Sequence, residues 1–148
     1  MPTSAECHPL PQGFQFENYH IERLLSQGGF SLVYLARDEQ GGPVVIKEYL
    51  PATLAGRPAG SLEPTVAPEN QGRFNTGMRA FLEEARLLAH IHHPNVVTVL
   101  NFAKANHTAY IVMRYEQGHS LDAYVGKLQE RGKPVREEFL RTVFVRLL

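Results

Sequence analysis

The segment LLSQGGFSLVYLA, residues 24–36, constrains the fold more than any other part of this chain. Two adjacent glycines, Gly28 and Gly29, separate two stretches whose β-branched and aromatic residues are typical of strands. Because glycine has no side chain, the backbone N–H groups of such a turn can approach a phosphate group closely. A glycine pair alone more often forms a tight hairpin turn with positive φ angles, so its role depends on the residues around it.

The succession of strand and helix signals predicts an α+β fold. Strand-like runs, a hairpin signal at residues 38–42 and a helical period follow one another along the chain. We expect strands at residues 18–25, 31–37, 43–50, 96–103 and 109–115, and helices at 74–91, near 120–128 and from 136 onward. This order predicts a five-stranded antiparallel sheet with one helix packed against it, followed by further helices.

The segments outside these elements have a different composition. Residues 1–17 are rich in proline and small polar residues and predict a flexible N-terminal arm. Residues 51–73 contain many prolines and glycines without an apolar period, which predicts a long exposed loop.

The composition disfavours several classes of function. The 15 lysines and arginines balance the 15 aspartates and glutamates, so no overall charge directs the chain to nucleic acid or to an anionic membrane. No apolar run reaches the roughly 18 residues that a membrane-spanning helix needs. The single cysteine, Cys7, and the lack of a signal-peptide pattern lead us to expect a cytoplasmic protein.

Lys47 and Glu84 are the charged residues that best fit a buried pair. Strand alternation places Lys47 on one face with Val45 and Tyr49. On a helical wheel, Glu84 lies away from the polar strip that contains its neighbour Glu83. A carboxylate on the buried side of a helix needs a cationic partner or becomes neutral. We therefore expect Glu84 to pair with Lys47, and Glu83 to be solvated.

Four stretches of the chain carry a resemblance to a known family: LSQGGFSLVY, VVIK, FLEEARLLAHIHHPNVV and AYIVMRYEQGHSL. In order and spacing they resemble the N-terminal lobe of eukaryotic-like protein kinases, most closely bacterial serine/threonine kinases. The resemblance covers residues 18–148. It implies a kinase small lobe over residues 18–116, with residues 51–73 as an insertion, and over 117–148 the hinge exit and first helices of an incomplete large lobe.

The resemblance assigns roles to the residues at matching positions. Gly28, Gly29 and Phe30 correspond to the tip of the loop over the ATP phosphates. Lys47 corresponds to the catalytic lysine that pairs with the α- and β-phosphates, and Glu84 to the carboxylate that holds this lysine in place. The resemblance thus implies ATP and Mg²⁺ as cofactors and a protein as the substrate.

Other positions correspond to family residues that contact the nucleoside. They are Leu25, Val33 and Val45 around the adenine ring, Met113 as the gatekeeper, Arg114, Tyr115 and Glu116 in the hinge, and Ser120 near the ribose.

The sequence departs from the kinase pattern in two ways. Ser26 and Ser31 stand where the phosphate-binding loop of the family usually has its first and third glycines. Neither an HRD nor a DFG motif occurs, so the family's catalytic aspartate and magnesium ligands are not in this chain. We expect the ATP-binding part of a serine/threonine protein kinase, a truncated domain that is inactive alone. A pseudokinase-like binding module is the alternative, and a free-standing domain of this length is a third.

A histidine cluster does not predict a metal site. His90, His92 and His93 are close in sequence, but no cysteine or carboxylate in the pattern completes a set of zinc ligands. We expect His93 to make a structural contact at the turn from helix to strand.

The last predicted helix has an apolar stripe, made up of Leu140, Val143, Phe144 and Leu147. Exposure of such a stripe on a monomer is unfavourable, which favours self-association of this chain through its helices.

Overall fold

The computed structural model describes residues 6–146 and contains two units. The first unit comprises the residues up to His92 together with Val97–Tyr115. The second unit comprises His93–Val96 together with the residues from Glu116 onward. Leu147, which the sequence places in the apolar stripe of the last helix, lies outside the described residues.

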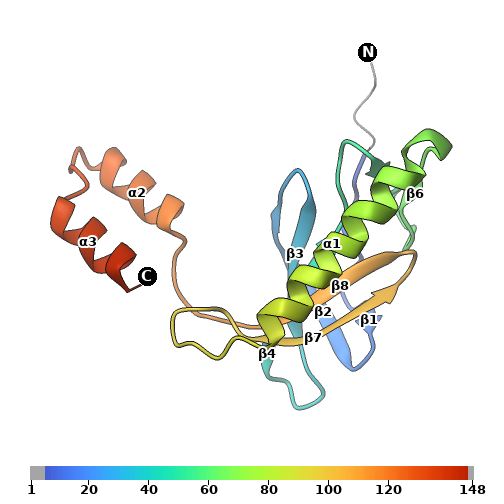
Figure 1. Cartoon of the computed structure of the whole chain (residues 1–148), viewed down its shortest axis with the longest axis horizontal. Coiled ribbons are helices and arrows are strands. Elements are labelled where there is room, and N and C mark those ends of the chain that lie inside the picture. Colours follow the sequence, from blue (N-terminus) through green and yellow to red (C-terminus); the bar gives the residue numbers. More distant parts are fainter. Residues whose placement is uncertain (1–5, 147–148) are drawn as a thin grey trace. The chain divides into compact units, whose positions relative to one another are not determined.

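The first unit is built on an antiparallel sheet with strand order β1-β2-β3-β4-β8-β7 (Figure 1). The strands are β1 (Gln15–Phe16), β2 (Tyr19–Gln27), β3 (Ser31–Arg37), β4 (Pro43–Tyr49), β7 (Val99–Ala105) and β8 (Thr108–Arg114). The five predicted strands are all present, and the two-residue strand β1 adds a sixth at the edge. The prediction of an α+β fold is confirmed.

Alternation along β4 gives the sheet two different faces. Val44, Ile46 and Glu48 are buried on one face. Lys47 and Tyr49 lie on the opposite face, where Tyr49 contacts Phe81 of the helix, with ring centroids 5.6 Å apart. One strand therefore contributes both to the core and to the space beside the helix.

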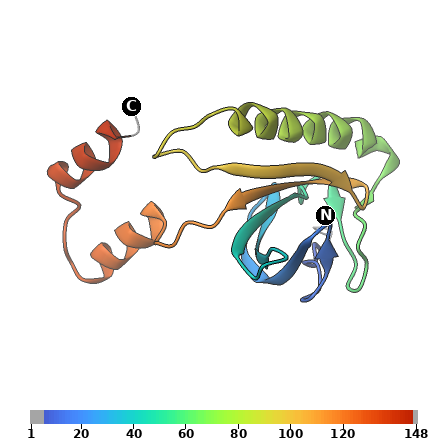
Figure 2. The same cartoon turned by 90° about the horizontal axis from the view of Figure 1, so that it is seen from below.

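Helix α1 (Gln71–Ala89) covers this second face and runs along β7 and β8 (Figure 2). It begins three residues before the predicted start at residue 74. Phe74 and Ala85 are its buried residues. Ala85 packs with Val99 of β7 and Ile111 of β8 in a small cluster that joins the helix to the sheet.

The N-terminal segment packs against the first unit, which makes the expectation of a flexible arm wrong for residues 6–17; residues 1–5 lie outside the described part. Leu10 and Phe16 are buried, at 4% and 3% exposure. Arg57 N donates to Glu6 O at 2.8 Å, and His8 N donates to Arg57 O at 3.0 Å. Apolar side chains and backbone hydrogen bonds hold this segment, although its proline content suggested mobility.

Residues 51–73 also differ from the exposed loop that we expected. They contain β5 (Ala55–Gly56), β6 (Thr65–Val66), the 3₁₀ helix η1 (Pro68–Asn70) and the start of α1. Ala55 and Arg57 are buried. A buried arginine fixes part of this insertion to the sheet, and periodicity carries no signal for such a contact.

The partner of Arg57 is Glu48 of β4. Both side chains are fully buried, and Arg57 Nη2 donates to Glu48 Oε2 at 2.9 Å. The hydroxyls of Tyr34 and Tyr110 donate to the same carboxylate at 2.7 and 3.2 Å, and Leu10 N donates to the Tyr34 hydroxyl. Burial acts to lower the pKa of Arg57, but the hydrogen bond and charge of Glu48 outweigh it and raise that pKa. The network joins the N-terminal segment, the insertion and three strands.

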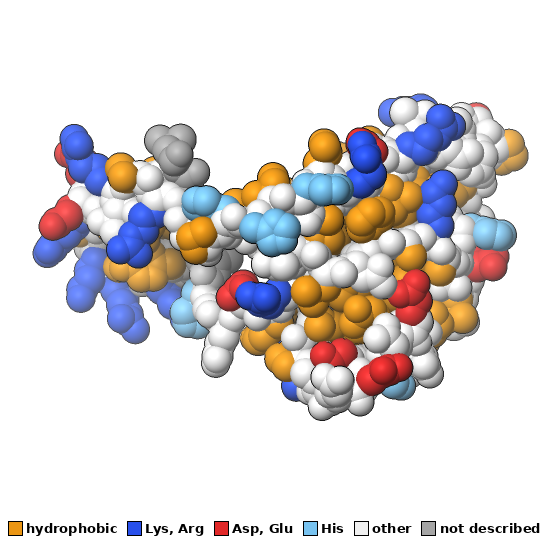
Figure 3. Space-filling model, turned by 60° about the horizontal axis from the view of Figure 1, so that its bottom comes forward, with side chains coloured by type: hydrophobic (Ala, Val, Ile, Leu, Met, Phe, Trp, Pro, Cys, Tyr) orange, Lys and Arg blue, Asp and Glu red, His pale blue; other side chains and the backbone are white. Residues whose placement is uncertain are grey.

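The second unit contains α2 (Leu121–Glu130) and α3 (Glu137–Val145). The rings of Tyr124 and Phe139 stack with centroids 4.7 Å apart and connect the two helices. Lysine and arginine side chains gather on this unit (Figure 3). Phe144 and Val145 of α3 are 48% and 69% exposed. Within residues 6–146, no helix is long and apolar enough to cross a membrane.

Candidate nucleotide site

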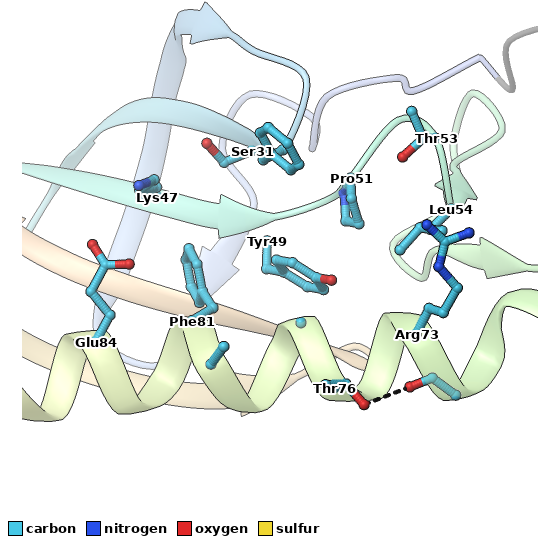
Figure 4. A pocket seen from close by; sticks show the side chains of 14 residues that line it. Ser31, Lys47, Tyr49, Pro51, Thr53, Leu54, Arg73, Thr76, Phe81 and Glu84 are labelled. Atoms are coloured by element: carbon cyan, nitrogen blue, oxygen red, sulfur yellow. Dashed lines mark hydrogen bonds between the residues drawn. The ribbon is translucent and has the colours of Figure 1, made fainter.

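A pocket of about 700 Å³ lies in the first unit between the glycine turn, β4, the segment after β4 and α1 (Figure 4). It is lined by Phe30, Ser31, Lys47, Tyr49, Pro51, Thr53, Leu54, Gly72, Arg73, Thr76, Gly77, Ala80, Phe81 and Glu84. Lys47 and Glu84, which were predicted to lie together, thus face the same space from a strand and a helix.

Lys47 contacts an aromatic ring of α1. Its Nζ lies 5.7 Å from the centroid of the Phe81 ring, a distance at which an ammonium is attracted to the ring face. The Glu84 carboxylate points from α1 toward the strand that carries Lys47 (Figure 4). Within the described residues, no ion pair joins Lys47 to Glu84. The two charges share the pocket without direct contact in this state.

Glu84 is exposed, so the expectation that it lies on the buried side of the helix is wrong. The helix buries Phe74 and Ala85 instead, and Glu84 lies at the edge of that face, beside the open pocket. Its carboxylate therefore needs no cation for its own solvation. Glu83 is exposed as expected, and its ion pair with Arg86 at 2.8 Å lowers its pKa, chiefly through the hydrogen bond.

The glycine turn connects β2 and β3, and its tip is hydrogen-bonded to the chain after β4. Ala52 N donates to Gly29 O at 2.9 Å, and Leu50 N donates to Phe30 O at 3.0 Å. Gly28 and Gly29 are not among the residues with positive φ, so a strained hairpin turn does not explain them. A side chain at Gly29 would meet no atom within 4 Å. The space beside this backbone is open, as close approach of a ligand requires.

Register places two of the predicted adenine contacts, Val33 and Val45, and the predicted gatekeeper, Met113, on the Lys47 face of the sheet. Val33 lies opposite Lys47, and Val45 lies opposite Met113. Val33, Val45 and Met113 are half-buried, and none of them lines the 700 Å³ pocket. Leu25 of β2 is 37% exposed and also lies outside that pocket.

The predicted hinge residues fall at the boundary between the two units. Arg114 and Tyr115 end the first unit, and Arg114 N donates to Thr98 O at 2.9 Å. Glu116 and Ser120 belong to the second unit. Ser120 caps α2, where its hydroxyl accepts from Ala123 N at 3.1 Å. The roles proposed for these residues toward a nucleoside remain predictions.

The histidine cluster makes local contacts. His90 Nδ1 lies 2.7 Å from Arg86 O, and His93 Nδ1 accepts from Asn95 N at 3.1 Å, at the turn from helix to strand. In the part of the chain that the structure describes, no group of three or more histidine, cysteine, aspartate or glutamate side chains could hold a metal ion.

Comparison with known proteins identifies the protein family to which the chain belongs. Residues 65–143, or 79 of the 148 residues, match the family described as protein tyrosine and serine/threonine kinase. The chain belongs to this protein kinase family, and the resemblance drawn from the sequence is confirmed.

Individual relatives include bacterial and animal kinases. The chain is 33% identical over 104 residues to serine/threonine-protein kinase pkn3 of Myxococcus xanthus, which covers 70% of this chain and 16% of that protein. It is 27% identical over 127 residues to the proto-oncogene tyrosine-protein kinase ROS of Rattus norvegicus, which covers 86% of this chain and 5% of that protein.

A solved structure described as "PpkA-294 apo form" superposes with a TM-score of 0.80 at 34% identity, over 90% of this chain and 47% of that one. The chain therefore spans less than half of each of these three relatives. The expected small-lobe fold is confirmed.

Proposed function

We propose that this chain forms the ATP-binding small lobe and first large-lobe helices of a serine/threonine protein kinase, whose complete catalytic domain transfers the γ-phosphoryl group of ATP to protein hydroxyls. The observation that carries the proposal is that Lys47, Glu84 and Phe30 of the glycine turn line one pocket, which Gly28 and Gly29 themselves do not line. Membership of the protein kinase family supports it.

Each part of the site has a role in the proposal. The Lys47 ammonium pairs with the α- and β-phosphates, and Glu84 orients it once the two groups meet. The glycine turn lets backbone N–H groups approach the phosphates. Val33 and Val45 share the Lys47 face and would contact the adenine ring together with Leu25, and Met113 on the same face would be the gatekeeper. Arg114, Tyr115 and Glu116 would form the hinge, and Ser120 would lie near the ribose.

Serine and threonine are the proposed acceptors because pkn3, the relative at 33% identity, is named a serine/threonine kinase. The tyrosine kinase ROS has the lower identity of 27%. A cytoplasmic location is part of the proposal and rests on the single cysteine of the sequence.

We propose further that these 148 residues bind nucleotide without transferring phosphate. The sequence has no HRD or DFG motif to supply a catalytic aspartate and magnesium ligands. When Mg²⁺ is bound in a complete kinase domain, it neutralises phosphate charge; this chain contributes Lys47 to that task. Incubation of the chain with radiolabelled ATP should give no autophosphorylation, and a labelled product would refute this part.

Nucleotide binding before and after Lys47→Met tests the main proposal. Hydrogen bonds to charged groups contribute about 1.5–3 kcal/mol, so we expect roughly 10- to 150-fold weaker ATP binding by calorimetry. Lys104→Met is the matched control, because Lys104 is exposed on β7 and lies outside the pocket. Equal and weak binding by all three proteins would favour the pseudokinase-like binding module.

A further inference from the structure

The Tyr49 side chain of strand β4 reaches helix α1 at Gly77. A β-carbon added to Gly77 would overlap the Tyr49 hydroxyl and lie 3.1 Å from Tyr49 Cζ. Real β-carbons almost never approach other atoms so closely, so a residue larger than glycine at position 77 would require either the Tyr49 side chain or the helix to shift.

Tyr49 cannot easily move aside. It is 6% exposed, and its ring lies 5.1 Å from the ring of Phe74 and 5.6 Å from that of Phe81. Its hydroxyl donates to Phe74 O at 3.2 Å. A larger residue at position 77 would therefore displace the helix rather than the tyrosine.

The contact between Tyr49 and Gly77 lies next to the functional residues on both elements. Lys47 is two residues before Tyr49 on the same face of β4, which is about 6.4–6.8 Å along the strand. Gly77, Phe81 and Glu84 follow at i, i+4 and i+7, so they share one face of α1. Figure 4 shows the Tyr49 side chain of the strand beside Phe81 of the helix, with Glu84 farther along the helix. A change in the spacing at Gly77 would therefore change the distance from Phe81 and Glu84 to Lys47.

We propose that Tyr49, seated against Gly77, is a spacer that fixes the separation of α1 from β4 and so positions Lys47 against Phe81 and Glu84. The two spacer residues touch neither phosphate nor metal and act through Lys47. The consequence for ATP binding rests on the proposed function, whereas the geometric role of the spacer does not.

A cycle of three variants tests the spacer: Gly77→Ala, Tyr49→Phe and the double variant. The first readout is the NMR shift of the Lys47 ε-methylene protons in the nucleotide-free chain, which we expect the nearby Phe81 ring to move upfield. We expect Gly77→Ala to abolish most of this shift. The double variant should largely restore it, because removing the hydroxyl removes the worst overlap.

The second readout is ATP affinity. We expect Gly77→Ala to weaken binding at least tenfold and the double variant to bind within about threefold of Tyr49→Phe. Gly126→Ala is the matched control, since Gly126 lies within helix α2 and a β-carbon there meets no atom within 4 Å. This control reports the gain in helix propensity alone and should change neither readout.

The outcomes separate the spacer from the proposed function. An unchanged Lys47 shift in Gly77→Ala would overturn the spacer, whatever the ATP affinity. A shift that follows the cycle in a chain that never binds ATP would support the spacer and reject the nucleotide site. If Gly77→Ala alone fails to fold, a folded double variant supports the proposal and an unfolded one overturns it.

Discussion

Arg57→Met should destabilise the first unit by about 3–5 kcal/mol, the usual cost of removing one partner of a buried ion pair. Arg57 and Glu48 are both fully buried, and two guanidinium nitrogens donate to the two carboxylate oxygens. Methionine preserves much of the apolar volume. Among the described residues, it leaves the Glu48 carboxylate with the hydroxyls of Tyr34 and Tyr110 as hydrogen-bond donors. The cost arises from an uncompensated buried charge.

Urea unfolding at pH 7, followed by circular dichroism, measures this cost. Arg37→Met is the matched control, since Arg37 pairs with Glu22 at 2.6 Å in the same sheet, but the two side chains are 43% and 38% exposed. A partly exposed pair of this kind contributes at most about 1 kcal/mol. We therefore expect the urea midpoint of Arg57→Met to fall well below that of Arg37→Met.

A second variant shows whether charge is the cause. In Glu48→Gln/Arg57→Met, the amide oxygen can accept from one of the two tyrosine hydroxyls and the amide NH2 can donate to the other, while the buried charge is gone. This double variant should regain about 1–3 kcal/mol relative to Arg57→Met, the range for an unsatisfied buried polar group. The reasoning is refuted if Arg57→Met and Arg37→Met have the same urea midpoint, or if the double variant is no more stable than Arg57→Met.

Two further predictions concern pH and association. Burial and the charge of Glu48 raise the pKa of Tyr34 and Tyr110 above the ordinary 10.0, so the folded state retains protons that the unfolded state loses. The stability that these two tyrosines contribute is fully present below about pH 10. Above pH 10, the free energy of unfolding should fall by up to about 1.4 kcal/mol per pH unit for each tyrosine. Urea titrations from pH 7 to 11 should show this, with a smaller decline in Tyr34→Phe; a rise above pH 10 would contradict it. Phe144→Ser should reduce self-association, measured by static light scattering, while Arg141→Ser on the same helix leaves it unchanged. A wild-type chain that stays monomeric at high concentration would reject self-association through α3.

The sheet and α1 could be predicted because their residues have a strong period. Alternation located Lys47 on the face that contacts α1. The helical wheel placed Glu84 and Glu83 on different parts of the helix surface, and although both are exposed, Glu84 lines the pocket and Glu83 does not. The wheel could not show that Glu84 lies at the edge of the packed face, because an angle on one helix does not reveal where the partner surface ends. The sequence also gave no sign that position 77 has no room for a side chain, because the residue that fills this space is Tyr49, 28 positions earlier in the chain.

The insertion and the N-terminal segment were harder to predict for a different reason. Their buried residues, such as Leu10 and Arg57, stand singly among prolines, glycines and polar residues. Their burial depends on partners far along the chain, and no local pattern records such pairing. The hydrogen bonds between the glycine turn and residues 50–52 are likewise made by backbone groups. Every sequence has such groups, so the pattern of side chains could not predict these bonds.

The buried pair between Arg57 and Glu48 limits how this protein could be shortened. Deletion of residues 52–66 would remove Arg57. The Glu48 carboxylate, on the same strand as Lys47, would then be buried without its cationic partner. Any compact version of the chain must therefore recode position 48 to a neutral residue in the same step.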